Sequence, residues 1–328
     1  MPQSFKPFTL LSHGMMQTIA SVYWPQIKRV SGVFRRHSVA IGRDGFLVVA
    51  ENRPQEWRPG QRIVLLVHGL TGSEESTHLI RLSDAFVRRG IITIRMNMRG
   101  CGPGVGLASG IYHSGRSEDT RAVLEWIGAE FPGSPVTQIG ISLGGNATLK
   151  MAGEMGDSKP NFLDSVVSVS APIDLAASSK RISQRRNLVF DRYFTRRLVK
   201  HVKTLNEKFP DKIPPLPLGW HSGQMSLARF DDMYVAPVSG FKNGLDYYLK
   251  CSSAAVIGNI RCRTLLLTAS DDPIVDPLTY TGLKYDPRHE VIVTAHGGHA
   301  AWIGQQKDPE FDRFWMDRRV VDWVLSLG

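Results

Sequence analysis

Short apolar segments alternate with amphipathic segments along most of the chain. The apolar segments, such as "RIVLLVHG" and "VTQIGIS", are rich in β-branched residues and begin near residues 62, 91, 136, 164, 263 and 289. Segments of helical character lie between most of them, for example "THLIRLSDAFVRRG" and "SEDTRAVLEWIGAEF". This alternation predicts an α/β fold with a mostly parallel sheet that is covered by helices on both faces. The earlier "HSVAIGRDGFLVVA" predicts an antiparallel hairpin about Asp44 and Gly45 at one edge.

The alternation is interrupted once, by about 85 residues between the apolar segments near 171 and 259. Apolar side chains recur there at helical spacing and predict an amphipathic helix: Phe190, Phe194, Leu198, Val202 and Leu205. We therefore expect one domain over 1–328, with a core of 1–172 and 259–328 and a helical insertion of about 173–258. An insertion at the carboxyl edge of a parallel sheet lies over the ligand crevice, so we interpret it as a lid.

Composition narrows the class of protein. The chain has 328 residues and is 42% hydrophobic, which is enough for a sizeable core and argues against disorder. No apolar run approaches the roughly 18 residues that span a bilayer, and the first residues make a poor secretory signal. Three scattered cysteines, Cys101, Cys251 and Cys262, favour free thiols over a disulfide framework or a zinc site. We expect a cytoplasmic protein.

The net charge of +10 is concentrated in one stretch. Between Lys180 and Lys203 nine basic residues face one acidic residue, Asp191, for a net charge of +8. The stretch is either a solvated helix face or a surface that attracts nucleic acid, acidic substrates or, by peripheral contact, anionic lipid. No nucleic-acid-binding motif accompanies it, so we expect no nucleic-acid partner.

A single hydroxyl lies between two glycines in "VTQIGISLGGNATLK", where Gly140, Ser142 and Gly144 form a GxSxG motif. The motif follows a predicted strand and precedes a predicted helix, which is the context of a nucleophile elbow. The alternative is a serine in an ordinary tight turn. In an elbow, the N–H of Leu143 at the start of the helix points toward a reacting carbonyl oxygen.

A serine nucleophile needs a base, which in turn needs an orienting acid, in the chain order serine, acid, histidine. "SDDPIVDP" follows one predicted strand and offers Asp271, Asp272 and Asp276; "HGGHAAW" follows another and offers His296 and His299. We choose Asp272 as the acid, with Asp271 as the alternative and Asp276 as a turn cap. We choose His299 as the base, because two glycines before it let the imidazole reach Ser142, and we assign His296 a structural role. His78 and His113 are expected on the surface or in packing.

The loop after the first parallel strand should supply a second donor for an oxyanion. "LLVHGLTGS" fits, because His68 and Gly69 end the strand and leave the N–H of Leu70 free. Metal chemistry is disfavoured, since the chain has no HExxH motif, paired cysteines or carboxylate cluster with ligand spacing. "GCGPGVG" near 101 lacks the context of a dinucleotide fingerprint, so no cofactor is expected.

Several longer motifs resemble one family. They are "FKPFTLLSHGMMQTI", "HGLTGSEES", "NMRGCG", "IYHSGRSEDTR", "GISLGGN", "FDDMYVAPVSGF", "YYLKCSS", "DDPIVDP" and "GGHAAW". Together they resemble the α/β-hydrolase superfamily and, within it, the YheT-like branch with the embryogenesis-associated proteins and the medium-chain ester hydrolases and acyltransferases. The resemblance covers nearly the whole chain and implies a charge relay of Ser142, Asp272 and His299. Ala269 replaces the usual glycine before the acid, which bears on the choice between Asp271 and Asp272, and the basic stretch has no counterpart.

These observations predict a serine carboxylic ester hydrolase for small-molecule esters with short to medium acyl chains, acting through an acyl-enzyme. We expect the aromatic residues Phe190, Phe194 and Trp220 to line the pocket for the acyl chain. Two enzymatic alternatives share the same three residues, namely an alcohol acyltransferase and a lipid or phospholipid acyl hydrolase. A catalytically silent binding protein of the same fold is the alternative outside enzymes.

Overall fold

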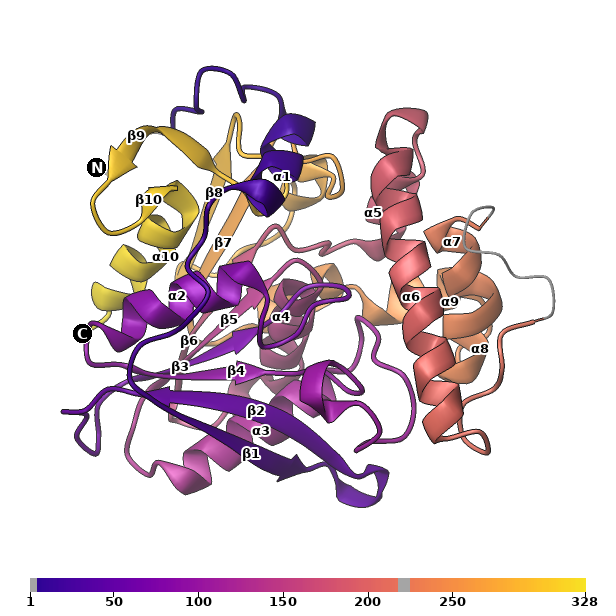
Figure 1. Ribbon diagram of the computed structural model, residues 1–328, viewed down its shortest axis with the longest axis horizontal. Coiled ribbons are helices and arrows are strands. Elements are labelled where there is room, and N and C mark those ends of the chain that lie inside the picture. Colours follow the sequence, from indigo (N-terminus) through magenta and orange to yellow (C-terminus); the bar gives the residue numbers. More distant parts are fainter. Residues whose placement is uncertain (1–4, 218–224) are drawn as a thin grey trace.

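An eight-stranded sheet runs through the centre of the computed structural model, which describes residues 5–217 and 225–328 (Figure 1). The strand order is β1-β2-β4-β3-β5-β6-β7-β8. The strands are β1 (Val33–Ala40), β2 (Phe46–Arg53), β3 (Ile63–Val67), β4 (Ile92–Met96), β5 (Val136–Ile141), β6 (Leu163–Val169), β7 (Arg263–Ala269) and β8 (His289–Thr294). β2 pairs antiparallel with β1 and β4, and the pairs from β4 to β8 are parallel. The predicted parallel sheet with an antiparallel edge is confirmed.

Helices cover both faces of this sheet. They are α2 (Thr77–Val87), α3 (Ser117–Glu130), α4 (Leu143–Met155) and α10 (Trp315–Leu325). In β3, Val64 and Leu66 belong to the core shared with α2 and α10, whereas Ile63 and Leu65 belong to the core shared with α3 and α4. Since successive side chains of a strand point to opposite faces, a strand buried on both faces must be apolar throughout. This explains the continuous apolar segments of the sequence.

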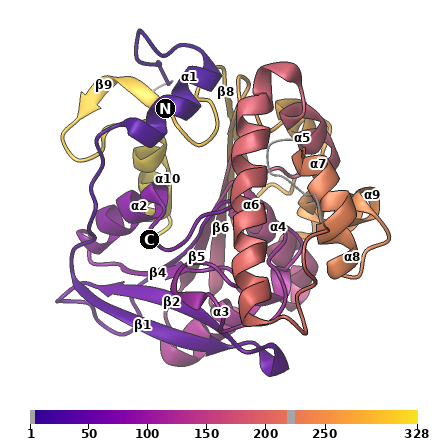
Figure 2. The same cartoon turned by 45° about the vertical axis from the view of Figure 1, so that its right-hand side comes forward.

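The connection between β6 and β7, residues 170–262, forms a separate group of helices beside the sheet (Figures 1 and 2). It contains α5 (Leu175–Ile182), α6 (Leu188–Lys208), α7 (Leu227–Phe230), a π-helical turn (Asp231–Val235), α8 (Ala236–Val238) and α9 (Gly244–Cys251). The predicted amphipathic helix is confirmed as α6, in which Phe190, Leu198, Val202 and Leu205 are buried and Phe194 is half-buried.

Both chain termini contribute elements that the periodicity did not predict. They are α1 (Gly14–Tyr23), β9 (Ile303–Asp308) and β10 (Asp312–Phe314). The segment before α1 lies along β9, where the N–H of Phe8 donates to the carbonyl of Ile303 at 2.9 Å. The Gln17 side chain donates to the Ile303 carbonyl at 3.0 Å and accepts its N–H at 2.7 Å. The N-terminal helix is therefore fastened to the segment that follows β8 (Figure 1).

Candidate active site

Ser142 lies at a sharp turn between β5, which ends at Ile141, and α4, which begins at Leu143. Its φ of 54° lies in the left-handed region, which a residue with a side chain rarely adopts. A Cβ atom at Gly140 would lie 2.2 Å from the carbonyl oxygen of Gly144, and one at Gly144 would lie 2.4 Å from that of Val67. Side chains at either position would therefore push the turn apart, which explains the two glycines of the motif.

The turn presents the Ser142 hydroxyl to His299. The His299 Nε2 atom is 2.8 Å from Ser142 Oγ, and its Nδ1 atom is 2.9 Å from Oδ2 of Asp272. Asp272 is fully buried, and its Oδ1 atom accepts the N–H groups of Ile274 at 2.8 Å and Val275 at 2.9 Å. Because a carboxylate only accepts hydrogen bonds, it favours the tautomer with a proton on Nδ1, which leaves Nε2 free to accept a hydrogen bond from the Ser142 hydroxyl.

The other acidic and histidine candidates are placed elsewhere. Asp271 accepts the N–H of Gly298 at 2.9 Å, and one of its oxygens is 3.5 Å from His296, which is exposed. Asp276 accepts the N–H of Leu278 at 3.1 Å and caps a short helical turn. Asp272 is thus the acid that the structure brings to His299.

The N-terminal helix holds the loop that carries His299. The His299 N–H donates to Thr18 Oγ1 at 2.8 Å, and the Thr18 hydroxyl donates to the Gly14 carbonyl at 2.8 Å. On the other side, the half-buried His78 imidazole is 2.8 Å from the carbonyl oxygen of Ala300. No role was predicted for Thr18 from the sequence, although it lies in the "FKPFTLLSHGMMQTI" motif.

Two backbone N–H groups lie free beside Ser142. Within the described chain, neither Leu70 nor Leu143 donates its N–H to another group, and both residues line a cavity that contains Ser142. The loop before Leu70 is held by His68, whose Nδ1 is 2.7 Å from the Gly69 carbonyl and whose Nε2 accepts the Met98 N–H at 3.0 Å. Burial lowers the pKa of His68 to about 4, so this imidazole stays neutral and can make both bonds.

The insertion contributes a contact to the acid loop that the sequence analysis missed. Arg181 donates from Nε to the carbonyl oxygen of Asp272 at 2.7 Å, although it belongs to the basic stretch. The eight other basic residues of that stretch are exposed, and none forms an ion pair with a described residue: Lys180, Arg185, Arg186, Arg192, Arg196, Arg197, Lys200 and Lys203. No sequence pattern distinguishes Arg181 from these neighbours.

Two cavities meet at Ser142. The larger has a volume of about 330 Å³, includes His299, and is lined mainly by apolar side chains of α1 and α6, among them Phe190 and Phe194. The smaller has a volume of about 90 Å³ and extends toward α5, the π-helical turn and α9. Trp220, the third aromatic residue expected in the pocket, lies outside the described residues.

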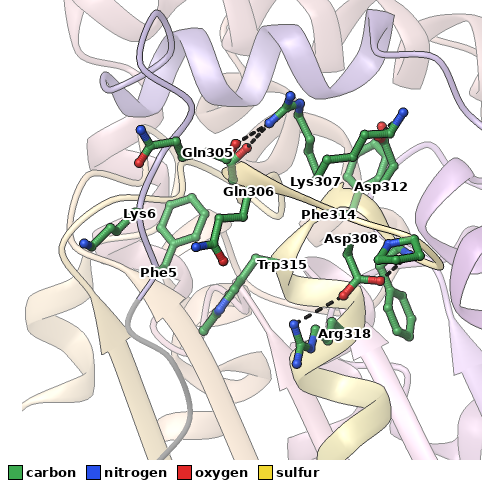
Figure 3. A pocket seen from close by; sticks show the side chains of 14 residues that line it. Phe5, Lys6, Gln305, Gln306, Lys307, Asp308, Asp312, Phe314, Trp315 and Arg318 are labelled. Carbon is green, nitrogen blue, oxygen red and sulfur yellow. Dashed lines mark hydrogen bonds and ion pairs between the residues drawn. The ribbon is translucent and has the colours of Figure 1, made fainter.

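A third cavity, of about 400 Å³, lies away from Ser142, between the N-terminal segment and the β9–β10 region (Figure 3). Four of its charged side chains form two ion pairs, Arg318 with Asp308 at 3.2 Å and Lys307 with Asp312 at 3.7 Å. It offers no nucleophile beside a base. Among the described residues, no group of three histidine, cysteine or acidic side chains is arranged to hold a metal ion, and no helix is long and apolar enough to cross a membrane.

The comparisons with known proteins agree with this architecture. The YheT protein of Escherichia coli (strain K12), which is named as a candidate esterase, is 29% identical over 98% of this chain and 93% of its own. A Saccharomyces cerevisiae protein named medium-chain fatty acid ethyl ester synthase/esterase 2 is 27% identical over 81% of this chain, which spans 62% of that longer protein. The Pyrococcus furiosus esterase Pf2001 superposes with a TM-score of 0.57 at 17% identity, covering 93% of this chain and 99% of its own, and so shares the fold.

The strongest of these findings is a match to a family as a whole. The sequence model described as the alpha/beta hydrolase fold matches residues 62–304, which is well over half of the chain and runs from β3 past His299. The chain therefore belongs to the alpha/beta hydrolase family, with the YheT-like proteins among its relatives.

Proposed function

We propose that this protein is a serine carboxylic ester hydrolase in which Ser142, His299 and Asp272 act as nucleophile, base and orienting acid. The observation that carries the proposal is the 2.8 Å separation of Ser142 Oγ from His299 Nε2. The two residues lie 157 positions apart and on different elements, so their contact is a product of the fold. Such a pair, with the base oriented by a buried carboxylate, is the arrangement that activates a serine hydroxyl.

The reaction has two halves. Ser142 Oγ attacks the acyl carbonyl while His299 Nε2 takes its proton, and the Leu70 and Leu143 N–H groups stabilise the negative oxygen of the tetrahedral intermediate. His299 then gives the proton to the leaving alcohol as the ester C–O bond breaks, which leaves an acyl-enzyme. Water attacks this ester by the same route and releases the acid. Asp272 keeps its contact with His299 Nδ1 throughout and stabilises the imidazolium.

The larger cavity supports an apolar acyl chain of short to medium length. Its volume of about 330 Å³ lies at the lower end of the range for small-molecule sites. The insertion of about 173–258 supplies Phe190 and Phe194 to its wall, which supports a role as a lid over the site. The names of two relatives also support an acyl ester as the substrate. One is named a candidate esterase and the other a medium-chain fatty acid ethyl ester synthase/esterase.

Acyl transfer is the second candidate, because an alcohol can replace water in the second half of the reaction. The yeast relative, named both a synthase and an esterase, favours testing it. A product assay with a p-nitrophenyl ester and added ethanol separates the two: hydrolysis releases the acid, whereas transfer releases the ethyl ester.

The test of the proposal is a panel of p-nitrophenyl esters of rising chain length, run on the wild type and on Ser142→Ala. We expect Ser142→Ala to lower kcat by at least about 10³-fold, because removing a triad nucleophile leaves only binding and oxyanion stabilisation. The matched control is Ser183→Ala, at an exposed serine after α5, which should match the wild type. Unchanged hydrolysis by Ser142→Ala would refute the assignment.

A further inference from the structure

Two motifs of the insertion have no part in the proposed relay of Ser142, His299 and Asp272. "FDDMYVAPVSGF" and "YYLKCSS" contribute Asp231 and Tyr248, and both side chains line the cavity of about 90 Å³ beside Ser142. Two serines of α5, Ser178 and Ser179, line the same cavity. Four polar side chains from three elements thus converge on a space that opens onto the nucleophile.

These side chains are connected to one another and retain unused hydrogen-bonding groups. The Tyr248 hydroxyl donates to Asp231 Oδ2 at 2.8 Å, and Ser179 Oγ is 3.0 Å from the same hydroxyl. The Ser178 hydroxyl is buried yet has no partner among the described residues. Asp231 Oδ1 likewise has no hydrogen bond within residues 5–217 and 225–328. A buried hydroxyl without a partner is costly to keep in a folded protein, so a ligand is a natural explanation for it.

The backbone at Asp231 is unusual as well. Residues Asp231–Val235 form a π-helical turn between α7 and α8. Such turns are rare inside helices and are found frequently at functional sites. The turn places Asp231 at the cavity, whereas its neighbour Asp232 is exposed and accepts the Gly244 N–H at 2.7 Å.

The protonation of Asp231 suits an uncharged partner. Burial, reinforced by the nearby Asp191 carboxylate and opposed by the hydrogen bond from Tyr248, raises the pKa of Asp231 to about 7. Near neutral pH the carboxyl can therefore either donate or accept a hydrogen bond. A hydroxyl group can complement both forms, whereas an anionic group would be repelled by the ionised one.

We propose that this small cavity is a polar subsite that binds a hydroxyl-bearing, uncharged part of the ester, with Asp231 and Ser178 as its specificity-determining residues. The proposal rests on the proposed role of Ser142. A volume of about 90 Å³ is well above the roughly 10–15 Å³ that a single water molecule needs, so the cavity can hold a small polar group. A hydroxyalkyl or glyceryl group fits that space, and the apolar remainder of the substrate then occupies the larger cavity.

The test uses two pairs of esters in which a hydroxyl replaces a methyl group of the same size. For the alcohol half the pair is 2-hydroxyethyl butanoate and propyl butanoate. For the acyl half it is ethyl 3-hydroxybutanoate and ethyl 3-methylbutanoate. We expect the wild type to favour the hydroxyl member of one pair by at least about tenfold in kcat/KM, because a site built to bind a hydroxyl discriminates against an analogue without it. The favoured pair shows which half of the ester enters the subsite.

Asp231→Leu and Ser178→Ala should each reduce this preference at least about fivefold. The preference is a ratio within one enzyme, so it is insensitive to how much of a variant folds, and Ser178→Ala serves if Asp231→Leu does not fold. Asp211→Asn and Ser183→Ala, exposed residues of the same insertion, are the matched controls and should keep the wild-type ratio.

A wild type without preference in either pair, or a preference that both variants retain, overturns the subsite. Failure of the proposed function looks different, because Ser142→Ala would then hydrolyse p-nitrophenyl esters at the wild-type rate. If only the subsite proposal fails, Ser142→Ala is inactive, and the wild type hydrolyses the esters without favouring the hydroxyl member of either pair.

Discussion

Several residues near Ser142 and His299 have a strained backbone. Besides Ser142, three non-glycine residues near it adopt a positive φ: Thr71 at 60°, Ser170 at 48° and Ala300 at 52°. Each such residue costs on the order of 1–3 kcal/mol and persists only where its surroundings enforce it. Here the Thr71 N–H donates to the Tyr112 hydroxyl at 2.9 Å, and the Ala300 N–H donates to Ser170 Oγ at 3.0 Å. The strain therefore supports a site that is set in place before substrate binds.

Variants of Thr18 test whether the site is set in place before substrate binds. Thr18→Val keeps the shape of the side chain but removes the oxygen that accepts the His299 N–H at 2.8 Å. We expect kcat for p-nitrophenyl butanoate to fall about tenfold with less than a twofold change in KM, because a small displacement of a catalytic group slows the chemical step. Thr18→Ser, which restores the hydroxyl, should recover kcat to within about twofold. A KM effect in place of a kcat effect, or no recovery with serine, would contradict a positioning role.

At the scale of elements, α6 combines two surfaces. Its N-terminal part contributes Phe190 and Phe194 to the larger cavity, while Val189 and Tyr193 on the same cavity are 54% and 49% exposed. The exposed basic residues of α6 continue from this apolar rim. Apolar side chains beside unpaired cations are typical of a surface that contacts anionic lipid, although a solvated helix face is the simpler interpretation.

Vesicle binding distinguishes the two interpretations. If the basic face binds lipid, the protein should sediment with vesicles of phosphatidylserine and phosphatidylcholine, and sedimentation should weaken as salt rises, because ions screen exposed charges. Vesicles of phosphatidylcholine alone are the control. The triple variant Arg192→Gln, Arg196→Gln, Lys200→Gln should lose most of the binding.

The matched control removes three positive charges from exposed residues outside the basic stretch and should bind the vesicles as the wild type does. Its substitutions are Arg43→Gln, Arg58→Gln and Lys284→Gln. If vesicle binding does not change with ionic strength, or if both triple variants lose it equally, the basic stretch is a solvated helix face.

The aromatic wall of α6 gives a second prediction at this scale. Phe194 lines both cavities at Ser142, so Phe194→Ala should enlarge the space for an acyl chain. We expect the preferred p-nitrophenyl ester to lengthen by two or more carbons. Phe46→Ala, at a half-exposed phenylalanine of β2, controls for the loss of an aromatic ring and should keep the wild-type profile. An unchanged profile in Phe194→Ala would show that the acyl chain does not pass this ring.

For the whole molecule, neutral histidines that are buried or half-buried make stability depend on pH. Burial lowers the pKa of His68 and His201 to about 4 and that of His78 and His113 to about 3. Unfolding frees each imidazole to bind a proton below its ordinary pKa of 6.5, so their contribution to stability is complete above pH 6.5 and is lost as the pH falls toward 4. Asp231, with its raised pKa, works in the opposite direction over part of this range.

Urea unfolding at several pH values measures the net effect of these histidines and carboxyls on the free energy of unfolding. We expect the four histidines to outweigh the carboxyls whose pKa burial raises, which are Asp231, Asp191, Asp271 and Asp317. The free energy of unfolding should therefore fall by at least about 2 kcal/mol between pH 7 and pH 5. It should change little between pH 7 and pH 8. A free energy that is flat or rising from pH 7 to pH 5 would contradict a neutral state of these histidines in the folded protein.

The sequence predicted the sheet well, because strands buried on both faces must be apolar and so are visible as patterns. It also predicted which serine, histidine and aspartate approach one another, since the fold orders these residues along the chain. It did not predict α1, β9 and β10 or the contacts of Thr18 and Arg181. These contacts join residues that lie far apart in the sequence: Thr18 and His299 are 281 positions apart, and Arg181 and Asp272 are 91 positions apart. Local periodicity does not encode such contacts.

The most direct measurement is covalent labelling with a fluorophosphonate, located by peptide mass spectrometry. If Ser142 is a nucleophile activated by His299, the wild type should carry one phosphonyl group, on Ser142, and His299→Gln should react at least about 10²-fold more slowly. Labelling of a different residue, or equal labelling rates for the wild type and His299→Gln, would contradict the proposed activation of Ser142 by His299.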